Sequence, residues 1–586
     1  MGIPRLTSTL QPYGFELRLQ GETVVIDGPA LAYHILHICR SNGEPQPAYS
    51  VIGYTTITWL NELYSQRVAI QAIYFDGHLP DSKKEIRVER LSKSSLRIAN
   101  IFSNSPHACQ SIHLTSSRNT RLLNTFGHDT SDFRYKADPS FLVPAVIEAL
   151  RRNNQYRHLV FVVPGEADAY CASHLVQSGG LVLTSDSDLL VYDLGQGRVV
   201  FLRDIYRRGN SAMVCTAFSS NLICQKLGIN KPTGPLRLAY QRQWDPHASL
   251  AQLVQACAKP IQDELDYSEF CRQYQLPKMP VTDHSCFAYI QGLDPRLSEL
   301  FLQLRQLGND SPSQATISLP VLLDSSARAT AWEFSTPLRR LTYKLLGADT
   351  GQLCPQVLEH RRVSHIAHKG TLVEVMSTYE TRELAQNLLH VAESIKEIVH
   401  ADDSIYWPLV CLITDMEESQ RQGKEPLARC LLQKTYKPDS QGYVDWDMVH
   451  VVAQLQATFY SFRMLQQTLS LISAHTADII GPNKNQLRAA LAGFPPLADC
   501  PNIDSTESLL LFCKTRQSNQ SLRKMLCLPR QETSETCRNE DMAAKGGTRK
   551  QSIKGNRFAR GKQSGQTCRG SNRSKSTNKF SVLSIE

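Results

Sequence analysis

The chain has 586 residues and a net charge of +9, and 41% of its residues are hydrophobic, which is enough apolar material for real cores. No run approaches the roughly 18 apolar residues of a membrane helix, and the start, MGIPRLTST, lacks the apolar stretch of a secretory signal, so we expect an intracellular protein without a membrane partner. Its 16 cysteines include no Cys-x-x-Cys pair, which argues against zinc ribbons and favours reduced thiols without disulfide partners.

Acids follow apolar, strand-like runs at four places in the N-terminal part of the chain. The runs read VVID (24–27), AIYFDG (72–77), LVFVVPGEAD (159–168) and LVLTSDSD (181–188). Aliphatic and β-branched residues without alternation predict strands buried on both faces, as in a parallel sheet. The carboxyl ends of such strands line one crevice. The sequence therefore predicts that six carboxylates converge there: Asp27, Asp76, Glu166, Asp168, Asp186 and Asp188.

Six carboxylates in one small volume repel one another unless cations are present. Hard oxygen ligands select Mg²⁺, with Mn²⁺ as an alternative, over Zn²⁺. Two such ions are the usual machinery of phosphodiester hydrolysis, so the pattern predicts a metal-dependent nuclease. Taken singly, each acid has another interpretation, as a helix N-cap or as part of a DSD turn. The shared strand-then-acid order at four places favours a common site.

A basic segment, DSKKEIRVERLSKSSLR (81–97), follows the second strand and predicts a helix. Lys83 and Arg90 are seven residues apart, which places them on nearly the same helix face. There they would neutralise charge that develops on a phosphate oxygen. The alternative is a basic helix face that is merely solvated.

From 100 to 139 the chain is rich in Ser, Thr, Asn and His, and this composition predicts a flexible insertion. Residues 140–200 return to helix, strand, helix and strand, and Gly165 and Glu166 would open the second of these helices. Beyond about residue 235 the pattern becomes helical.

Two helices stand out in this later region. Ser377 and Glu380 form a capping-box sequence, followed by apolar residues on one face: Leu384, Leu388, Val391, Ile395 and Ile398. A second set spaced by three and four predicts a strongly amphipathic helix: Met448, Val452, Leu455, Phe459, Phe462, Leu465, Leu469 and Ile472. We expect both helices to pack within the chain and not as a coiled coil.

The last part of the chain is a basic tail. Residues 545–579 hold eleven Lys or Arg and no acid, which leaves −1 for residues 1–544 once Glu586 is counted. Such a segment cannot bury a core, so we expect it to be disordered. Its Gly, Arg and Phe558 suit non-specific contact with nucleic acid. Recognition for nuclear import and simple solvation are the alternatives.

Several motifs resemble the flap-endonuclease and xeroderma-pigmentosum-G superfamily of PIN-like nucleases, over roughly residues 1–230. They are MGI at the start, VVIDGPALAY, YFDGHLP, VPGEADAYCA and TSDSDLLVYD. Within that superfamily the chain is most similar to the Asteroid branch in its fungal form. Later stretches, RLAYQRQWDPHASLAQLV and VEVMSTYETRELAQNLL among them, add to this likeness.

The resemblance implies roles for individual residues. The six acids would be metal ligands, and Lys83 and Arg90 would face the scissile phosphate. Gly2 and Tyr33 would bind substrate, with the Tyr33 ring stacked on a base, although Tyr33 could instead pack behind the first strand. The family's arch over the active site would correspond to 100–139, in a loosened or absent form.

One departure from the family pattern is clear. The superfamily adds a further acid in a glycine-containing segment before its helix–two-turn–helix DNA clamp. Here SNLICQKLGI (220–229) runs almost directly into NKPTGPLRLAYQ, so this segment is missing and the clamp is degenerate. Altered ligation, weak activity or an exon missing from the gene sequence would each account for this.

These observations predict three parts: a PIN-like α/β nuclease domain at 1–230, a mostly α-helical domain at 231–525 and a disordered basic tail at 526–586. The expected function is Mg²⁺-dependent, structure-selective cleavage of DNA or RNA, with flap or branched DNA among the substrates. The alternative is a catalytically degraded nucleic-acid-binding or scaffold protein. We expect a nuclear location, with the cytoplasm as the alternative.

Overall fold

The computed structural model divides the chain into two compact units, Met1–Leu528 and Pro529–Glu586. All of the described residues belong to the first unit, and the second unit, which holds most of the predicted tail, lies outside them. The described residues are 3–115, 123–126, 137–208, 212–229, 234–277, 284–306, 314–351, 355–362, 370–401, 403–433, 442–472, 477–481, 483–516, 518–526 and 528.

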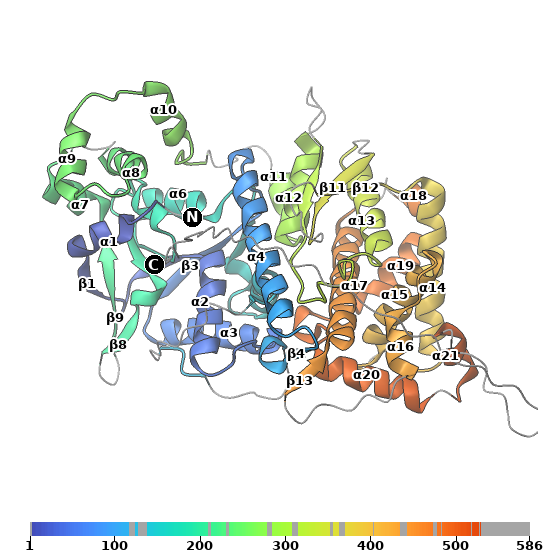
Figure 1. Cartoon of the computed structure of the whole chain (residues 1–586). Coiled ribbons are helices and arrows are strands. Elements are labelled where there is room, and N and C mark those ends of the chain that lie inside the picture. The colour runs from blue at the N-terminus through green and yellow to red at the C-terminus, as the bar shows by residue number, and fades with distance from the viewer. Residues whose placement is uncertain are drawn as a thin grey trace, which may run out of the picture. The chain divides into compact units, whose positions relative to one another are not determined.

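An eight-stranded sheet organises the N-terminal part (Figure 1). Its order is β1-β9-β7-β6-β2-β3-β5, with β8 paired to β9. The five strands from β7 to β5 run parallel, whereas β1, β8 and β9 form an antiparallel edge. The strands are β1 (Phe15–Arg18), β2 (Thr23–Asp27), β3 (Ala69–Asp76), β5 (Val160–Val163), β6 (Leu181–Thr184), β7 (Arg198–Phe201), β8 (Tyr206–Arg208) and β9 (Ala212–Phe218). The predicted parallel sheet is confirmed.

Helices cover both faces of this sheet, which explains why its strands lack polar alternation. Along β2, Val24 and Ile26 face one core and Val25 faces the other. The first core is closed by α2 (Gly28–Ser41), α3 (Tyr49–Ser65) and α5 (Leu142–Arg152). The second is closed by α1 (Leu6–Leu10), α6 (Ala167–Ser178), α7 (Ser220–Leu227) and α8 (Gly234–Trp244).

The basic segment forms a short 3₁₀ turn, η2 (Asp81–Lys83), and a long helix, α4 (Lys84–Asn104). The helix therefore runs into the region where we expected the flexible insertion. After it, β4 (Ala108–Gln110) pairs antiparallel with β13 (Tyr443–Asp445), and the 3₁₀ turn η3 (Ser111–His113) follows. The rest of the predicted insertion lies largely outside the described residues, at 116–122 and 127–136.

The later part of the first unit is mostly helical, as expected, with one small sheet. Its strands are β10 (Thr316–Ser318), β11 (Gln356–His360) and β12 (Thr371–Glu374). Its helices are α11 (His284–Ile290), α12 (Pro295–Gln306), α13 (Thr336–Asp349), α14 (Thr378–Lys396), α15 (Tyr406–Arg421), α16 (Leu427–Gln433), α17 (Trp446–Leu471), α18 (Ala477–Ile480), α19 (Asn483–Ala492), α20 (Ile503–Thr515) and α21 (Gln520–Met525). The capping box of Ser377 and Glu380 opens α14, which confirms that prediction. No helix in the described ranges is long and apolar enough to span a bilayer.

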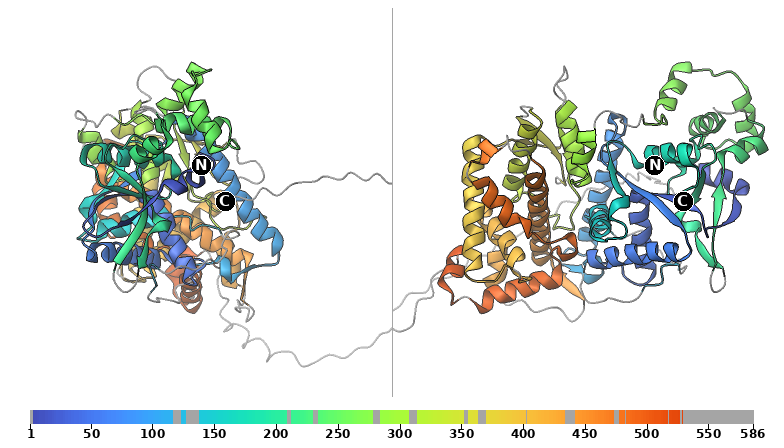
Figure 2. Two further views of the ribbon diagram at one scale, coloured as in Figure 1. Left: turned by 90° about the vertical axis from the view of Figure 1, so that its left-hand side faces the viewer. Right: turned by 180° about the vertical axis from the view of Figure 1, so that it is seen from behind.

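The centre of this bundle is α17, which contacts α13, α15, α16, α19 and α20 (Figure 2). We predicted an amphipathic helix here, and that detail is wrong, because α17 is buried on nearly every side. Polar residues on it, such as Ser461 and Thr468, are buried too and donate to the carbonyl oxygens of Ala457 and Met464. Packing within the chain, the other half of the prediction, is confirmed.

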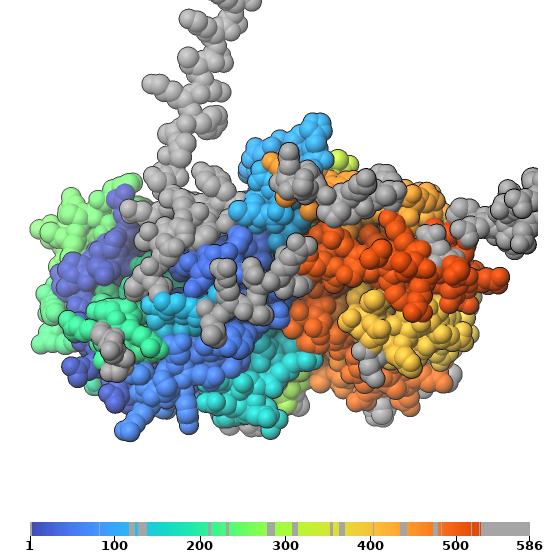
Figure 3. Space-filling view, turned by 90° about the horizontal axis from the view of Figure 1, so that it is seen from below, coloured from blue at the N-terminus to red at the C-terminus, as the bar shows by residue number. Residues whose placement is uncertain are grey.

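The helical part shares a core with the nuclease-like part. Phe141, at the start of α5, stacks on Tyr460 of α17 with ring centroids 4.4 Å apart. The 3₁₀ turn η8 (Leu497–Asp499) packs against α3 and α5. In a space-filling view the blue residues and the orange and red helices meet directly (Figure 3).

A helical arm leaves the sheet after α7 and consists of α8, α9 (Leu250–Ala258) and α10 (Glu264–Arg272). Two of its arginines form hydrogen bonds within the arm: Arg237 donates to the backbone carbonyl of Lys259, and Arg242 donates to that of Ala248. At the end of α8, Trp244 is 71% exposed.

Candidate active site

The predicted acids lie at the carboxyl edge of the parallel sheet. Asp27 ends β2 and Asp76 ends β3. Glu166 and Asp168 stand at the start of α6, just after β5. Asp186 and Asp188 belong to the 3₁₀ turn η5 (Ser187–Leu190) and its N-cap, just after β6. Since β6, β2, β3 and β5 are neighbours in this order, the structure brings all four segments together.

Asp27 and Asp186 are linked through Thr184. The buried Asp27 carboxyl accepts the Thr184 hydroxyl at 2.7 Å, and Thr184 Oγ1 accepts the Asp186 backbone N–H at 2.9 Å. Asp27 also accepts the Ala30 N–H at 3.1 Å and so caps α2. The alternative interpretation of this acid as a helix cap is therefore correct, and its role as a metal ligand stays a prediction.

Asp76 is hydrogen-bonded to the start of α6. Its Oδ1 accepts the backbone N–H of Ala167 at 2.7 Å, so the β3 end is fixed between Glu166 and Asp168. Gly77 permits this close approach, because a Cβ there would meet the carbonyl oxygen of Val163. The predicted helix begins at Ala167 with Glu166 at its N-cap.

Asp188 is held by residues that are distant in the sequence. Its Oδ1 accepts the Ile3 backbone N–H at 3.0 Å. Burial, together with the nearby charge of Asp188, raises the pKa of Tyr274, from the segment after α10. The buried Tyr192 ring lies against the acids and contacts the Tyr274 ring edge-on, with centroids 5.5 Å apart. Sequence reasoning missed both tyrosines, because no motif connects them with the acids.

The acids raise one another's pKa. Burial, with the charges of Asp76 and Asp186, raises the pKa of Asp27 to about 7 against the effect of its hydrogen bonds. Burial and the charge of Asp186 raise that of Asp188 to about 6. Burial and four neighbouring carboxylates hold the pKa of Asp168 well above its usual range. Within the described residues no hydrogen-bond donor meets the Asp168 carboxyl. The edge thus carries negative charge that the chain itself compensates only in part.

Lys83 is the cation that enters this cluster. Its Nζ lies 2.5 Å from Glu166 Oε1, and it also acts electrostatically on Asp168 and Asp188. Burial alone would lower the pKa of Lys83, but the ion pair with Glu166 outweighs it and raises the pKa. Burial raises the pKa of Asp76, and the charge of Arg87, one turn further along α4, counteracts this rise. Arg87 also forms an ion pair with Glu299 of α12. The sequence analysis did not single out Arg87, although its spacing from Lys83 places it on the same face.

Arg90 and Tyr33 lie outside the acid cluster but near each other. Arg90 is exposed on α4. Burial raises the pKa of Tyr33 on α2, and the positive charges of Arg296, Arg90 and Arg97 counteract this rise. Tyr33 is 54% exposed, which counts against the alternative in which its ring packs behind the first strand. An exposed aromatic ring beside guanidinium groups suits contact with a nucleobase and its phosphates. Gly2 lies outside the described residues.

The acid cluster matches a divalent cation in chemistry but not in geometry. Oxygen donors with uncompensated charge are the chemistry that Mg²⁺ and Mn²⁺ require. As the side chains stand, however, no group of three or more His, Cys, Asp or Glu in the described part of the chain is arranged to hold an ion. The cluster therefore has the right chemistry without a preformed coordination shell.

Two comparisons show what the chain is similar to. A family model described as "XPG domain containing" matches residues 138–375. The chain is 22% identical to Asteroid homolog 1 of Schizosaccharomyces pombe over 404 residues, which is 65% of this chain and 67% of that protein. Both matches support a similarity of this chain to XPG-like proteins of the Asteroid type. The match to the family model spans the acids from Glu166 to Asp188 and Tyr274, whereas Asp27 and Asp76 precede it.

This similarity has two consequences. Its sheet with parallel strands and flanking helices is of the PIN-like type. An XPG-type domain indicates a nuclease-related function and nucleic-acid substrates.

Proposed function

We propose that the chain is a Mg²⁺-dependent, structure-selective nuclease that hydrolyses phosphodiester bonds of DNA or RNA with two metal ions, Mn²⁺ being able to replace Mg²⁺. The observation that carries the proposal is the meeting of acids from four adjacent strand ends, with Lys83 among them. Bound divalent cations supply Lewis acidity at the scissile phosphate.

The chain's own residues then have distinct tasks. The six acids (Asp27, Asp76, Glu166, Asp168, Asp186 and Asp188) would hold the ions. Lys83 would donate to a phosphate oxygen at the same edge, where charge develops. Arg90 and the exposed Tyr33 would bind substrate next to the cluster, with the ring stacked on a base.

The alternative is a nucleic-acid-binding protein that has lost catalysis. Two observations favour it: the absence of a preformed metal group among the described residues, and the short connection between α7 and α8, where the family's acidic segment is missing. The two functions differ in one measurable respect, which is turnover in the presence of metal.

We expect the purified full-length chain to cleave a labelled flap substrate with Mg²⁺ or Mn²⁺ and not with EDTA. Mg²⁺ should also raise the melting temperature, because an ion that binds only the native state stabilises it by about 2.7 kcal/mol at one hundred times its Kd. For a unit of this size that corresponds to a shift on the order of 2 °C. Flap assays with each metal and with EDTA measure the cleavage, and thermal melts across a Mg²⁺ series measure the shift in melting temperature. Binding of the flap without cleavage and without a metal-dependent shift would favour the alternative.

A further prediction concerns the basic tail, which we propose adds affinity and no selectivity. Each phosphate it neutralises releases counterions, with a slope of log affinity on log salt of about −0.9 per contact on duplex DNA and about −0.7 on single strands. Deletion of residues 545–586 should therefore flatten the salt dependence and preserve the preference among flap, single-stranded and duplex ligands. Binding of full-length and truncated protein across a salt series is the measurement. Identical slopes would mean that the tail touches no phosphate.

The composition of the tail also supports a nuclear location, because Lys- and Arg-rich segments suit import recognition. The cytoplasm is the alternative, and the distribution of a tagged chain with and without residues 545–586 distinguishes the two.

A further inference from the structure

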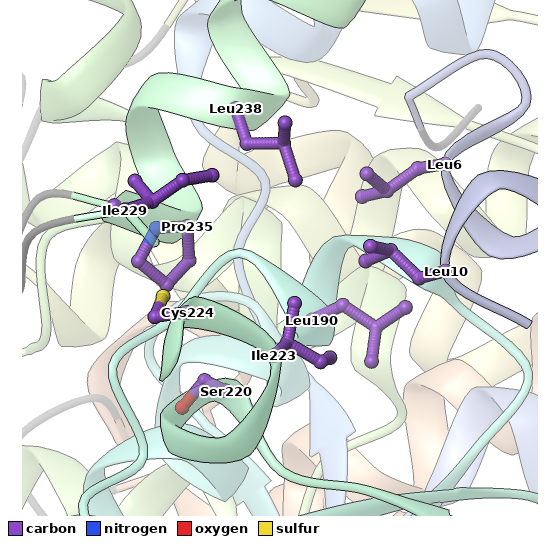
Figure 4. Close-up of a pocket in the computed structure, with 10 residues that line it drawn as sticks. Leu6, Leu10, Leu190, Ser220, Ile223, Cys224, Ile229, Pro235 and Leu238 are labelled. Carbon is purple, nitrogen blue, oxygen red and sulfur yellow. The ribbon is translucent and has the colours of Figure 1, made fainter. Parts of the chain in front are cut away.

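The small three-stranded sheet of the helical part borders an open groove. The groove has a volume of about 350 Å³, which lies in the usual range of ligand sites, and all four residues of β12 line it together with the start of α13 and the end of α15. The cavity in which Leu238 faces Leu6 and Leu10 is different, because its volume of about 10 Å³ holds one water molecule at most (Figure 4). That cavity is core packing, whereas the groove has room for a ligand.

The outer edge of β12 carries backbone groups that the sheet does not use. β12 is the last strand in the order β10-β11-β12 (Figure 1). The Val375 N–H donates to the Pro355 carbonyl on the β11 side at 2.8 Å. Since the backbone groups of successive residues in an antiparallel pair point to opposite sides, those of Leu372 and Glu374 point away from β11.

One of these outward groups has a partner: the Glu374 carbonyl accepts a hydrogen bond from Arg340 Nε at 2.7 Å. The Glu374 N–H and both backbone groups of Leu372 form no hydrogen bond with another described residue. A strand edge of this kind can pair with an added strand.

Two other strand edges of the molecule are closed by glutamine side chains. Gln291 donates to the Val162 carbonyl of β5 at 2.7 Å and accepts its N–H at 2.9 Å. Gln303 does the same to Thr316 of β10, at 3.1 and 2.8 Å. Each amide takes the place of a neighbouring strand and so protects the edge from pairing. In the described part of the chain, β12 has no such amide.

The side chains on the exposed face of β12 indicate what kind of strand fits. Leu372 is 49% exposed, and Glu374, two residues further, lies on the same face and is exposed too. Glu374 forms no ion pair with a described residue, whereas the two arginines that line the groove are each paired with a glutamate. An apolar side chain beside Leu372 and a basic one beside Glu374 complement this face.

We propose that the edge of β12 binds an extended peptide of a partner protein, which adds a fourth strand to the small sheet. The peptide places an apolar residue beside Leu372 and a Lys or Arg, two positions away, beside Glu374. Its backbone pairs with the outward groups of Leu372 and supplies affinity, while the two side chains supply selectivity. This docking is independent of the proposed nuclease function, because β12 holds none of the residues assigned to it.

The first test is selection from a displayed library of random nonapeptides on the full-length chain. We expect enriched peptides to carry an apolar residue and a Lys or Arg two positions apart. Fluorescence anisotropy then measures the affinity of the most enriched peptide for the wild type and for Leu372→Pro. Proline removes the outward N–H, which is not part of the ladder with β11, so the edge tolerates it. We expect at least about tenfold weaker binding, as for a lost hydrogen bond at the upper end of its usual contribution.

Glu374→Gln and Glu383→Gln form a matched pair that tests the charge. Glu374 lines the groove, whereas Glu383 is an exposed acid on α14 outside it. We expect Glu374→Gln to weaken peptide binding about two- to fivefold, as for the loss of an exposed ion pair. Glu383→Gln should bind the peptide like the wild type.

The proposal is wrong if no peptide is enriched, if enriched peptides lack the apolar and basic pair, or if Leu372→Pro and Glu374→Gln bind like the wild type. Circular dichroism shows whether Leu372→Pro is folded. Should it fail to fold, Leu372→Ala replaces it, because alanine keeps the N–H and removes the apolar contact. Weaker binding in both Leu372→Ala and Glu374→Gln then supports the docking edge, and unchanged binding in either contradicts it.

Discussion

Asp168→Asn is expected to abolish cleavage and to raise the melting temperature of the metal-free protein. The carboxyl lies near four other carboxylates, which with burial hold its pKa well above the usual range. An amide of the same shape removes this repulsion and also removes a ligand. We expect a loss of at least about 10³-fold in kcat, which corresponds to about 4 kcal/mol in the activation free energy. Opposite changes in stability and activity are typical of acids retained for function.

The stabilisation by Asp168→Asn should depend on pH in a defined direction. Below the pKa of an unfolded carboxyl, near 4, Asp168 is neutral in both states and its replacement changes little. Between that pH and the elevated folded-state pKa, the unfolded carboxyl ionises while the native one stays protonated among like charges, so the wild type loses stability as the pH rises. The gain in melting temperature should therefore grow as the pH rises above about 4 and level off only above the elevated folded-state pKa.

Thermal melts of both proteins in EDTA, with flap cleavage in Mg²⁺, measure the two effects of Asp168→Asn. Asp204→Asn is a suitable control, because burial raises the pKa of Asp204 too, although it lies outside the acid cluster. It should cleave like the wild type. Full activity in Asp168→Asn would contradict the assignment of this acid to the site.

Lys83→Ala is expected to lower kcat by about 10²- to 10³-fold with little change in KM, as happens when a donor to a developing charge is removed. Its ammonium, 2.5 Å from Glu166, also serves as an internal counter-ion for the acids. Without it the cluster carries one more uncompensated negative charge, so Mg²⁺ should bind more tightly to the variant. Lower turnover together with tighter metal binding is a combination that general destabilisation does not produce.

Steady-state cleavage and Mg²⁺-dependent melting of Lys83→Ala provide the test. Lys93→Ala is the matched control, because Lys93 lies on the same helix and pairs with the exposed Glu89. If Lys83→Ala binds substrate weakly and turns over normally at saturation, α4 is a docking surface only.

The parallel sheet was predictable because its signal is local. Each strand is a short aliphatic run, and each acid follows its run directly, so their common edge follows from strand order alone. The roles of these acids remain predictions, since geometry places them together without an ion. The spacing from Arg90 was enough to single out Lys83. The ion pair between Lys83 and Glu166 could not be predicted, because the two residues follow different strands and are distant in the sequence.

Other features depend on packing between distant segments. The apolar positions of α17 suggested one buried face, yet its serine and threonine hydroxyls bond back to the preceding turn and so tolerate burial on the opposite side. The position of Tyr274 near the acids could not be predicted from its sequence surroundings, because Asp188 is brought close to it only by the fold of the arm. The burial of α17 depends on the helices packed around it, and the position of Tyr274 depends on a segment distant in the sequence.

The exposed Trp244 gives the arm an optical signal of its own. The other four tryptophans of the chain, Trp59, Trp332, Trp407 and Trp446, are buried. Iodide and other aqueous quenchers that do not enter cores therefore act chiefly on the emission of Trp244. A nucleic acid or protein that covers the arm would protect this fraction of the fluorescence, and one that binds elsewhere would leave it quenchable. The native chain thus carries a label-free reporter at the end of α8, in the same arm that delivers Tyr274 to the acids.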